Sequence, residues 1–245
     1  MKTRAQTVPA AKAKKTRLFE ILEELKEKHA HFSHAAIRSA ISSAKLSFTN
    51  KTFNLYLIDA VKRGIIHNAG RGWYSRYPAP VRLNPTPVRK LIRAVKKAFP
   101  LLDFSVWSTA QLNPWLHHLV AKPVAFLYVP REALDSVGDT LRESGWDVAI
   151  NPGKRESAHA IRPGEKMLAL RPAHTMQPQP DNHQAAIAQI VVELPIESEN
   201  LALMDTREAN EAAIRIVNSG NTHIVEIHKY AKYRRIITPD FSSTS

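Results

Sequence analysis

The run from residue 47 to residue 63, SFTNKTFNLYLIDAVKR, carries polar side chains of the types that bind DNA bases. After a helix cap at Ser47 or Thr49, apolar residues recur at helical spacing, and we expect Leu57, Ile58 and Val61 to enter the core. Polar residues occupy the exposed start of this helix: Asn50, Lys51, Thr52 and Asn54. An asparagine amide can bond adenine, and a lysine can bond guanine or phosphate, when a helix N-terminus enters the major groove. The run predicts a DNA-reading helix; a capped surface helix with uncommitted polar residues is the alternative.

Basic residues on either side of this helix are suited to the DNA backbone. Arg71 stands between Gly70 and Gly72 at the tip of an expected hairpin. There it could enter a minor groove, lie along phosphates or remain a solvated turn residue. Phosphate contacts position a protein on DNA without specifying sequence. The predicted DNA-binding set is completed by four basic residues: Arg38, Lys45, Arg71 and Arg76.

Three helices and a hairpin must hold these side chains in place. An apolar stripe predicts a first helix from a cap at Thr16, Ser33 caps a second helix, and Gly64 is placed to end the third. Short strands are expected at residues 65–66 and 73–77, with a glycine-rich turn between them. Three helices followed by a β-hairpin is the order of a winged helix-turn-helix, which we expect over residues 16–80.

The charge of the chain is concentrated in its first part. Residues 1–98 hold 21 Lys and Arg against 5 Asp and Glu, whereas residues 99–245 hold 14 against 17. A domain with such an excess suits a polyanionic partner, and double-stranded DNA is the expected one. Residues 1–15 are basic and lack large apolar side chains, so we expect a disordered basic arm there.

The rest of the chain predicts a second domain of a different kind. After a proline-rich joint, a cationic helix at residues 87–97 could extend the DNA surface, meet an acidic partner or simply be solvated. Residues 86–245 then alternate strands and helices and end in a mainly helical tail. The fold class we expect is therefore α/β (α+β overall): an N-terminal winged helix-turn-helix followed by a small α/β domain.

Three stretches resemble a known family. FTNKTFNLYLIDAVKRGIIHNAGRGWYS resembles the recognition-helix and wing segment of the AbiEi family, and LDFSVWSTAQLNPWLHHLVAKPVAFLYVP and KYAKYRR resemble parts of its C-terminal domain. The resemblance runs from about residue 16 to residue 237. AbiEi proteins are transcriptional regulators and antitoxins of bacterial type IV toxin–antitoxin, abortive-infection systems.

The resemblance implies a sequence-specific repressor that binds inverted repeats in its own promoter. It also implies an antitoxin role in phage defence for residues 86–245, with a nucleotidyltransferase-like toxin of the AbiEii type as the cognate partner. Family members neutralise that toxin without necessarily forming a stable complex with it.

An enzyme is the main alternative: a degenerate nuclease or nucleotidyltransferase with a DNA-targeting module. The expected signatures are missing from the sequence, because GKRES at residues 153–157 lacks the upstream glycine of a phosphate loop and no Asp-x-Asp pair occurs. Asp103, Asp147 and Glu165 are the carboxylates that could still meet in space. A structural nucleic-acid-binding protein without a regulatory role is a third reading.

We therefore expect no catalytic activity, no cofactor and no metal site. Histidines that are close together in the sequence are expected to point in diverging directions, which favours surface or hydrogen-bonded roles over a metal site. The chain has no cysteine, no apolar run of about 20 residues and no secretory signal, which together predict a cytoplasmic protein without a membrane span.

Overall fold

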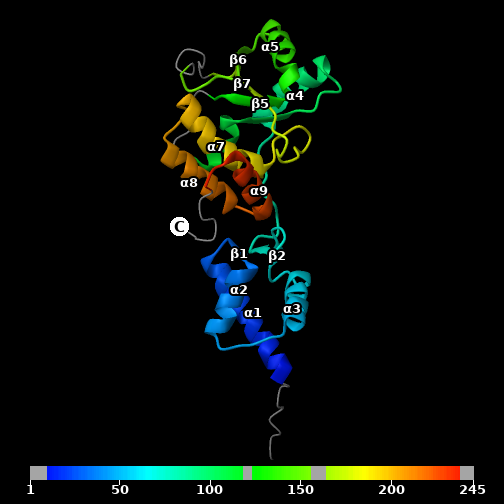
Figure 1. The fold of residues 1–245 in the computed structure, drawn as a ribbon, viewed down its shortest axis with the longest axis vertical. Coiled ribbons are helices and arrows are strands. Elements are labelled where there is room, and N and C mark those ends of the chain that lie inside the picture. Colours follow the sequence, from blue (N-terminus) through cyan, green and yellow to red (C-terminus); the bar gives the residue numbers. More distant parts are fainter. Residues whose placement is uncertain (1–9, 118–122, 156–163, 238–245) are drawn as a thin grey trace, which may run out of the picture. The chain divides into compact units, whose positions relative to one another are not determined.

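The computed structural model describes residues 10–117, 123–155 and 164–237. The chain divides into two compact units (Figure 1). The N-terminal unit contains described residues 10–80 and 218–225, and the second unit contains the described parts of 81–217 and 226–237. Both units combine helices with a small sheet, so the expected mixture of α and β structure is confirmed. Among the described residues, no helix combines the length and the apolar character needed to cross a bilayer.

Local signals set the ends of α2 (His34–Ser43) and α3 (Asn50–Lys62) in the N-terminal unit. The hydroxyl of Ser33 accepts a hydrogen bond from the Ala36 amide, and the hydroxyl of Thr49 accepts one from the Thr52 amide. Both are N-cap bonds that satisfy an otherwise unpaired helix donor. After α3, Gly64 has a φ of +71°, which glycine adopts without strain. The cap at Ser33 and the end of α3 at Gly64 were predicted and are confirmed. Of the two caps expected for α3, Ser47 and Thr49, the structure selects Thr49.

Helix α1 (Ala10–Lys28) begins earlier than predicted. Residues 10–15 are helical rather than part of a disordered arm, and residues 1–9 lie outside the described residues. Alanine has the highest helix propensity, and three of these six residues are alanines. Thr16 is therefore inside the helix, where its hydroxyl donates to the Lys12 carbonyl oxygen at 3.1 Å instead of capping.

A three-stranded antiparallel sheet completes the N-terminal unit. It consists of β1 (His31–Ser33), β2 (His67–Asn68) and β3 (Trp73–Ser75), in the order β1-β3-β2. The hairpin β2–β3 was expected, but its first strand lies two residues later than predicted, since Ile66 is fully buried in the helical core instead. The pairing of β1 with β3 was not predicted.

A segment far along the chain also belongs to this unit. The Ile224 amide donates to the Ala69 carbonyl oxygen at 3.0 Å, and the Asn221 amide donates to the Ala79 carbonyl oxygen at 2.8 Å. Gly70 has a φ of +109°, and a Cβ atom there would lie 2.9 Å from Cγ2 of Val225. Residues 218–225 therefore pack directly against the hairpin turn.

The second unit is built on a four-stranded sheet of order β4-β5-β7-β6. Its strands are β4 (Ser105–Ser108), β5 (Ala125–Val129), β6 (Asp147–Ile150) and β7 (Met167–Pro172). β5, β7 and β6 are parallel, and β4 is antiparallel to β5. The sequence predicts strands at residues 104–107, 124–129, 146–150 and 167–171, and the structure confirms them to within a residue or two.

Helices cover both faces of this sheet (Figure 1). α4 (Thr86–Ala98) and α5 (Leu134–Glu143) pack on one face around Val106, Leu127 and Leu168. α7 (Ile187–Leu201), α8 (Thr206–Val217) and α9 (Ile224–Arg234) form the tail, which is helical as expected, and α7 bonds to the other face. The sequence also predicts a helix at residues 109–119, of which residues 118–119 lie outside the described residues. Its described part contains a 3-10 helix, η1 (Thr109–Trp115), because Pro114 lacks the amide that an α-helix needs.

Candidate functional site

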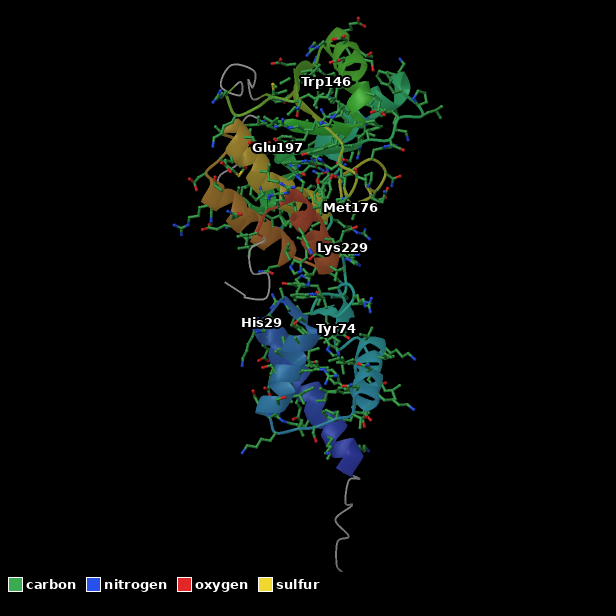
Figure 2. The ribbon with its side chains drawn as sticks, in the orientation of Figure 1. His29, Tyr74, Trp146, Met176, Glu197 and Lys229 are labelled. Carbon is green, nitrogen blue, oxygen red and sulfur yellow. The ribbon has the colours of Figure 1, made fainter. Side chains whose placement is uncertain are left out.

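Helix α3 separates its residues into a buried and an exposed side. Phe53, Leu57 and Ala60 are buried in the core of the N-terminal unit. On the opposite side, residues at spacings of i, i+4, i+7 and i+11 form the outer face of α3, which consists of Lys51, Leu55, Ile58 and Lys62. All four side chains are exposed, and side chains project outward from α3 in Figure 2. This face is therefore open to a partner.

Two of these residues were not predicted to lie on an exposed face. Ile58 was expected in the core but is 52% exposed, and Leu55, which was not singled out, is 55% exposed. The helical period explains both: with residues 53, 57 and 60 facing inward, residues 55 and 58 must face outward. The same period could have found Leu55, Ile58 and Lys62 from the sequence.

The predicted base-contacting residues at the start of α3 are used unequally. Asn50 is exposed, but its Oδ1 accepts a hydrogen bond from Nη2 of Arg38 at 2.8 Å. Thr52 is half-buried, and its hydroxyl accepts from the hydroxyl of Thr49 at 2.9 Å as part of the helix cap. Asn54 is exposed and flanks the outer face of α3. Lys51 and Asn54 are therefore the predicted residues whose position best suits contact with DNA.

The predicted phosphate-contacting residues also divide into two groups. Lys45, in the turn between α2 and α3, and Arg71, in the hairpin turn, are exposed. Arg38 stacks over the ring of Phe53, 4.5 Å from its centroid, so its guanidinium is partly held in place. Arg76 is half-buried and donates to the Lys26 carbonyl oxygen at 3.4 Å and to the Tyr77 hydroxyl at 2.6 Å. We remove Arg76 from the candidate interface because its guanidinium serves the fold of the unit.

Acidic residues do not neutralise this surface. Between Glu27 and Asp103 the sequence contains one acid, Asp59. Its carboxylate binds Lys15 at 2.7 Å and Arg63 at 2.9 Å, and the hydrogen bond from Lys15 lowers the pKa of Asp59. In the described part of the chain, neither Lys51 nor Lys62 lies within ion-pair distance of a carboxylate. The outer face of α3 therefore keeps its positive charge.

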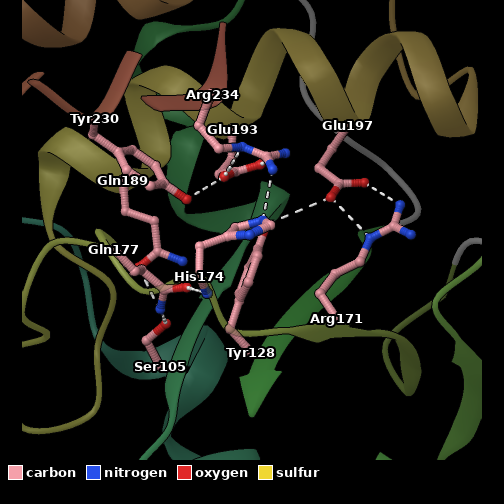
Figure 3. A network of polar contacts seen from close by, with 10 residues as sticks. All are labelled: Ser105, Tyr128, Arg171, His174, Gln177, Gln189, Glu193, Glu197, Tyr230 and Arg234. Carbon is pink, nitrogen blue, oxygen red and sulfur yellow. Dashed lines mark hydrogen bonds and ion pairs between the residues drawn. The ribbon is translucent and has the colours of Figure 1, made fainter. Parts of the chain in front are cut away.

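The second unit contains a different polar cluster, which is buried between the sheet and the tail helices (Figure 3). Arg171 of β7 and Glu197 of α7 form a bidentate ion pair, and both residues are less than a tenth exposed. Nη1 of Arg171 also donates to the Pro152 carbonyl oxygen at 2.7 Å. Tyr128 donates to the same glutamate at 3.5 Å. This pair ties α7 to β7 and to the end of β6.

A second pair adjoins the first (Figure 3). Glu193, one helical turn before Glu197, binds Arg234 of α9 at 2.9 Å and accepts a hydrogen bond from the Tyr230 hydroxyl. Burial raises the pKa of Glu193 to about 7, although Arg234 and Tyr230 act in the opposite direction. His174 contacts Arg234 at 2.6 Å, and its burial lowers its pKa to about 4. Both glutamates are matched by arginines, so we assign this cluster a role in holding the tail helices on the sheet.

A pocket of about 450 Å³ lies beside this cluster. It is lined by Asp103 and Phe104, by Tyr128, and by the loop of residues 173–183, including His174 and His183. His183 stacks on Phe104 with ring centroids 4.1 Å apart. His174 and His183, which line this pocket, are both held by contacts within the protein.

The carboxylates that the enzyme alternative requires do not come together. Asp103 precedes β4, whose antiparallel register with β5 puts it beside the carboxyl end of β5. Asp147 and Glu165 lie at the amino ends of β6 and β7, which is the opposite edge of the sheet. Over the described residues, no group of three or more histidines and carboxylates is placed to hold a metal ion. In the GKRES segment, Lys154 binds Glu199 at 3.0 Å, while residues 156–163 lie outside the described residues.

Comparison with known proteins places this chain in a family but does not supply an activity. No curated protein matches the sequence. The profile of DUF6577, described as a family of unknown function, matches residues 52–239, from the first turn of α3 to beyond α9. Because the match spans well over half of the sequence, the chain belongs to DUF6577, a family of unknown function.

Proposed function

We propose that the N-terminal unit is a winged helix-turn-helix domain and that the protein is a sequence-specific DNA-binding repressor. The order of elements supports this proposal: helix α1, strand β1, helices α2 and α3, then the hairpin β2–β3. In this proposal α2 and α3 form the helix-turn-helix, and the hairpin is the wing.

The observation that carries the proposal is the charge of the outer face of α3. Lys51 and Lys62 stand at its two ends, Asn54 flanks it, and the nearby Asp59 is already bound by Lys15 and Arg63. A helix with an exposed cationic face and no free acid suits the major groove, whose walls are phosphates. Lys45 and Arg71 would then add phosphate or minor-groove contacts at either side.

The test is a titration of the full-length protein against duplex DNA from upstream of its own gene, with a scrambled duplex as control, at near-physiological salt. We expect the protein to bind the upstream duplex at least about 10³-fold more tightly than the scrambled duplex. Lys51→Ala should lower the slope of log affinity against log salt by about 0.9 if it contacts one phosphate. Lys232→Ala, which removes an exposed lysine of the second unit, is the charge-matched control and should leave the specificity ratio unchanged. Equal binding to both duplexes would overturn the repressor proposal.

The antitoxin role belongs to the same proposal and is supported by the resemblance to AbiEi proteins over residues 16–237. The second unit would supply it in the cytoplasm, against a nucleotidyltransferase-like toxin encoded by a neighbouring gene and without a catalytic step or cofactor of its own. Co-expression tests this: the full-length protein should restore growth of cells that express that neighbour. Growth arrest that persists despite equal expression would contradict the antitoxin role and leave the repressor proposal intact.

A further inference from the structure

We infer that Leu55 and Ile58, at the centre of the outer face of α3, recognise the C5-methyl groups of thymines in the major groove. This inference rests on the proposed DNA binding and names the chemical groups that the outer face of α3 would read.

The two side chains form an exposed apolar pair with no role in the core. They are 55% and 52% exposed and lie three residues apart, on one side of one helix. The core side of α3 is already filled by Phe53, Leu57 and Ala60. A partner that covers these two large apolar side chains gains binding free energy, because removing apolar surface from water is favourable.

The charges around the pair identify the partner as DNA. Lys51 precedes Leu55 by one helical turn, and Lys62 follows Ile58 by one turn. At 1.5 Å per residue the two lysines are about 16 Å apart along the helix, and the major groove is about 12 Å wide. A helix lying in the groove can therefore bring both lysines to the phosphate walls while the apolar pair faces the floor. A protein partner would instead need acids opposite both lysines and an apolar patch between them.

The floor of the major groove presents one apolar group, the thymine methyl. Hydrogen-bonding groups on this face are few, because the Asn50 side chain is held by Arg38 and Thr52 belongs to the helix cap. Sequence preference would then come in large part from where the thymine methyls lie relative to Leu55 and Ile58.

The experiment compares the upstream duplex with the same duplex in which every thymine is replaced by deoxyuridine, which removes the methyl group and keeps the base-pairing edge. Fluorescence anisotropy with the full-length protein should show binding to the deoxyuridine duplex weakened by about tenfold, the equivalent of about 1.4 kcal/mol. The Leu55→Ala/Ile58→Ala variant should bind both duplexes with equal affinity. Lys51→Ala should weaken binding to both and preserve their ratio.

Four outcomes would overturn the inference. Tight and equal binding of the wild-type protein to both duplexes would overturn it while leaving the proposed function intact. If the Leu55→Ala/Ile58→Ala variant still preferred the thymine duplex to the deoxyuridine duplex as strongly as the wild-type protein does, other residues would recognise the methyl groups. A change in oligomeric state of that variant, measured by light scattering, would show that the pair is a contact between copies of the chain. Absence of binding to any duplex would instead refute the proposed function, and this inference with it.

Discussion

In the N-terminal unit the basic residues of the outer face of α3 point into solvent, whereas in the second unit two arginines are drawn into the protein and matched with glutamates. Lys51 and Lys62 are exposed, while Arg171 and Glu197 are 7% and 2% exposed. Charge that stays in water is available to a ligand at little structural cost. Charge removed from water must be paired, and it then contributes to the shape of the fold.

This difference indicates which unit to test for ligand binding and which unit to test for stability. The exposed cations of α3 have an excess of charge that no nearby acid balances, which makes the N-terminal unit a candidate for binding a polyanion. The buried pairs of the second unit are balanced internally, so perturbing them should change stability first.

The largest effect should come from breaking a buried pair. Arg171→Ala leaves the Glu197 carboxylate buried without its main partner and should lower the free energy of unfolding by about 3–5 kcal/mol. Urea unfolding followed by circular dichroism measures this change. Lys154→Ala, which breaks the exposed pair with Glu199, should cost at most about 1 kcal/mol. Lys51→Ala should change stability by no more than about 0.5 kcal/mol. If Lys51→Ala lost as much stability as Arg171→Ala, the distinction between exposed and buried charges would be wrong.

The second prediction concerns the pH dependence of the buried cluster. The pKa of Glu193 is raised to about 7, so the folded state binds its proton more tightly than the unfolded state, whose pKa is about 4.5. The resulting stability is present below pH 4.5 and is lost as pH rises through 7. The free energy of unfolding of the wild-type protein minus that of Glu193→Gln should therefore fall between pH 4.5 and pH 8 by an amount on the order of 2 kcal/mol.

The pH prediction needs a control, because His174 titrates in the opposite sense. Its pKa is lowered to about 4, so its contribution is present above pH 6.5 and is lost as pH falls toward 4. Repeating the comparison in a His174→Gln background removes this contribution. A difference between wild type and Glu193→Gln that does not vary with pH in that background would mean that Glu193 is ionised throughout.

The third prediction tests the contact between the hairpin turn and residues 218–225. Gly70→Ala combines a positive φ of +109° with a Cβ atom 2.9 Å from Val225, and it should destabilise the protein by about 1–3 kcal/mol. Gly72→Ala has a φ of +76° but open space around the new Cβ atom, so its effect should be smaller. Equal thermal stabilities of the two variants would show that the contact with Val225 is unimportant.

The smallest effect should come from the N-cap of α3. Thr49→Ala removes the acceptor of the Thr52 amide and should cost about 1 kcal/mol. Ser47→Ala is the matched control, because Ser47 is exposed and does not cap the helix. Thermal unfolding of both variants measures the difference. If Ser47→Ala proved the more destabilising, the assignment of Thr49 as the cap would be wrong.

Features that depend on residues a few positions apart could be predicted from the sequence. The cap at Ser33, the end of α3 at Gly64 and the positions of the strands of the second unit were predicted in this way, from residue types and side-chain periodicity. The choice of Thr49 over Ser47 as the cap of α3 was not. The inward and outward sides of α3 follow from the same periodicity, although the sequence analysis assigned Ile58 to the wrong side.

Features that join distant parts of the chain could not be predicted and emerge from the tertiary structure. Glu197 meets Arg171 across 26 residues, and Thr222 meets the buried His31 at 3.3 Å across 191 residues. Asn50 and Arg76 were predicted as DNA contacts, yet their side chains bond to Arg38 and to the Lys26 carbonyl oxygen. A side chain's type and spacing show what it can bind, but which partner it meets depends on packing that no local pattern records.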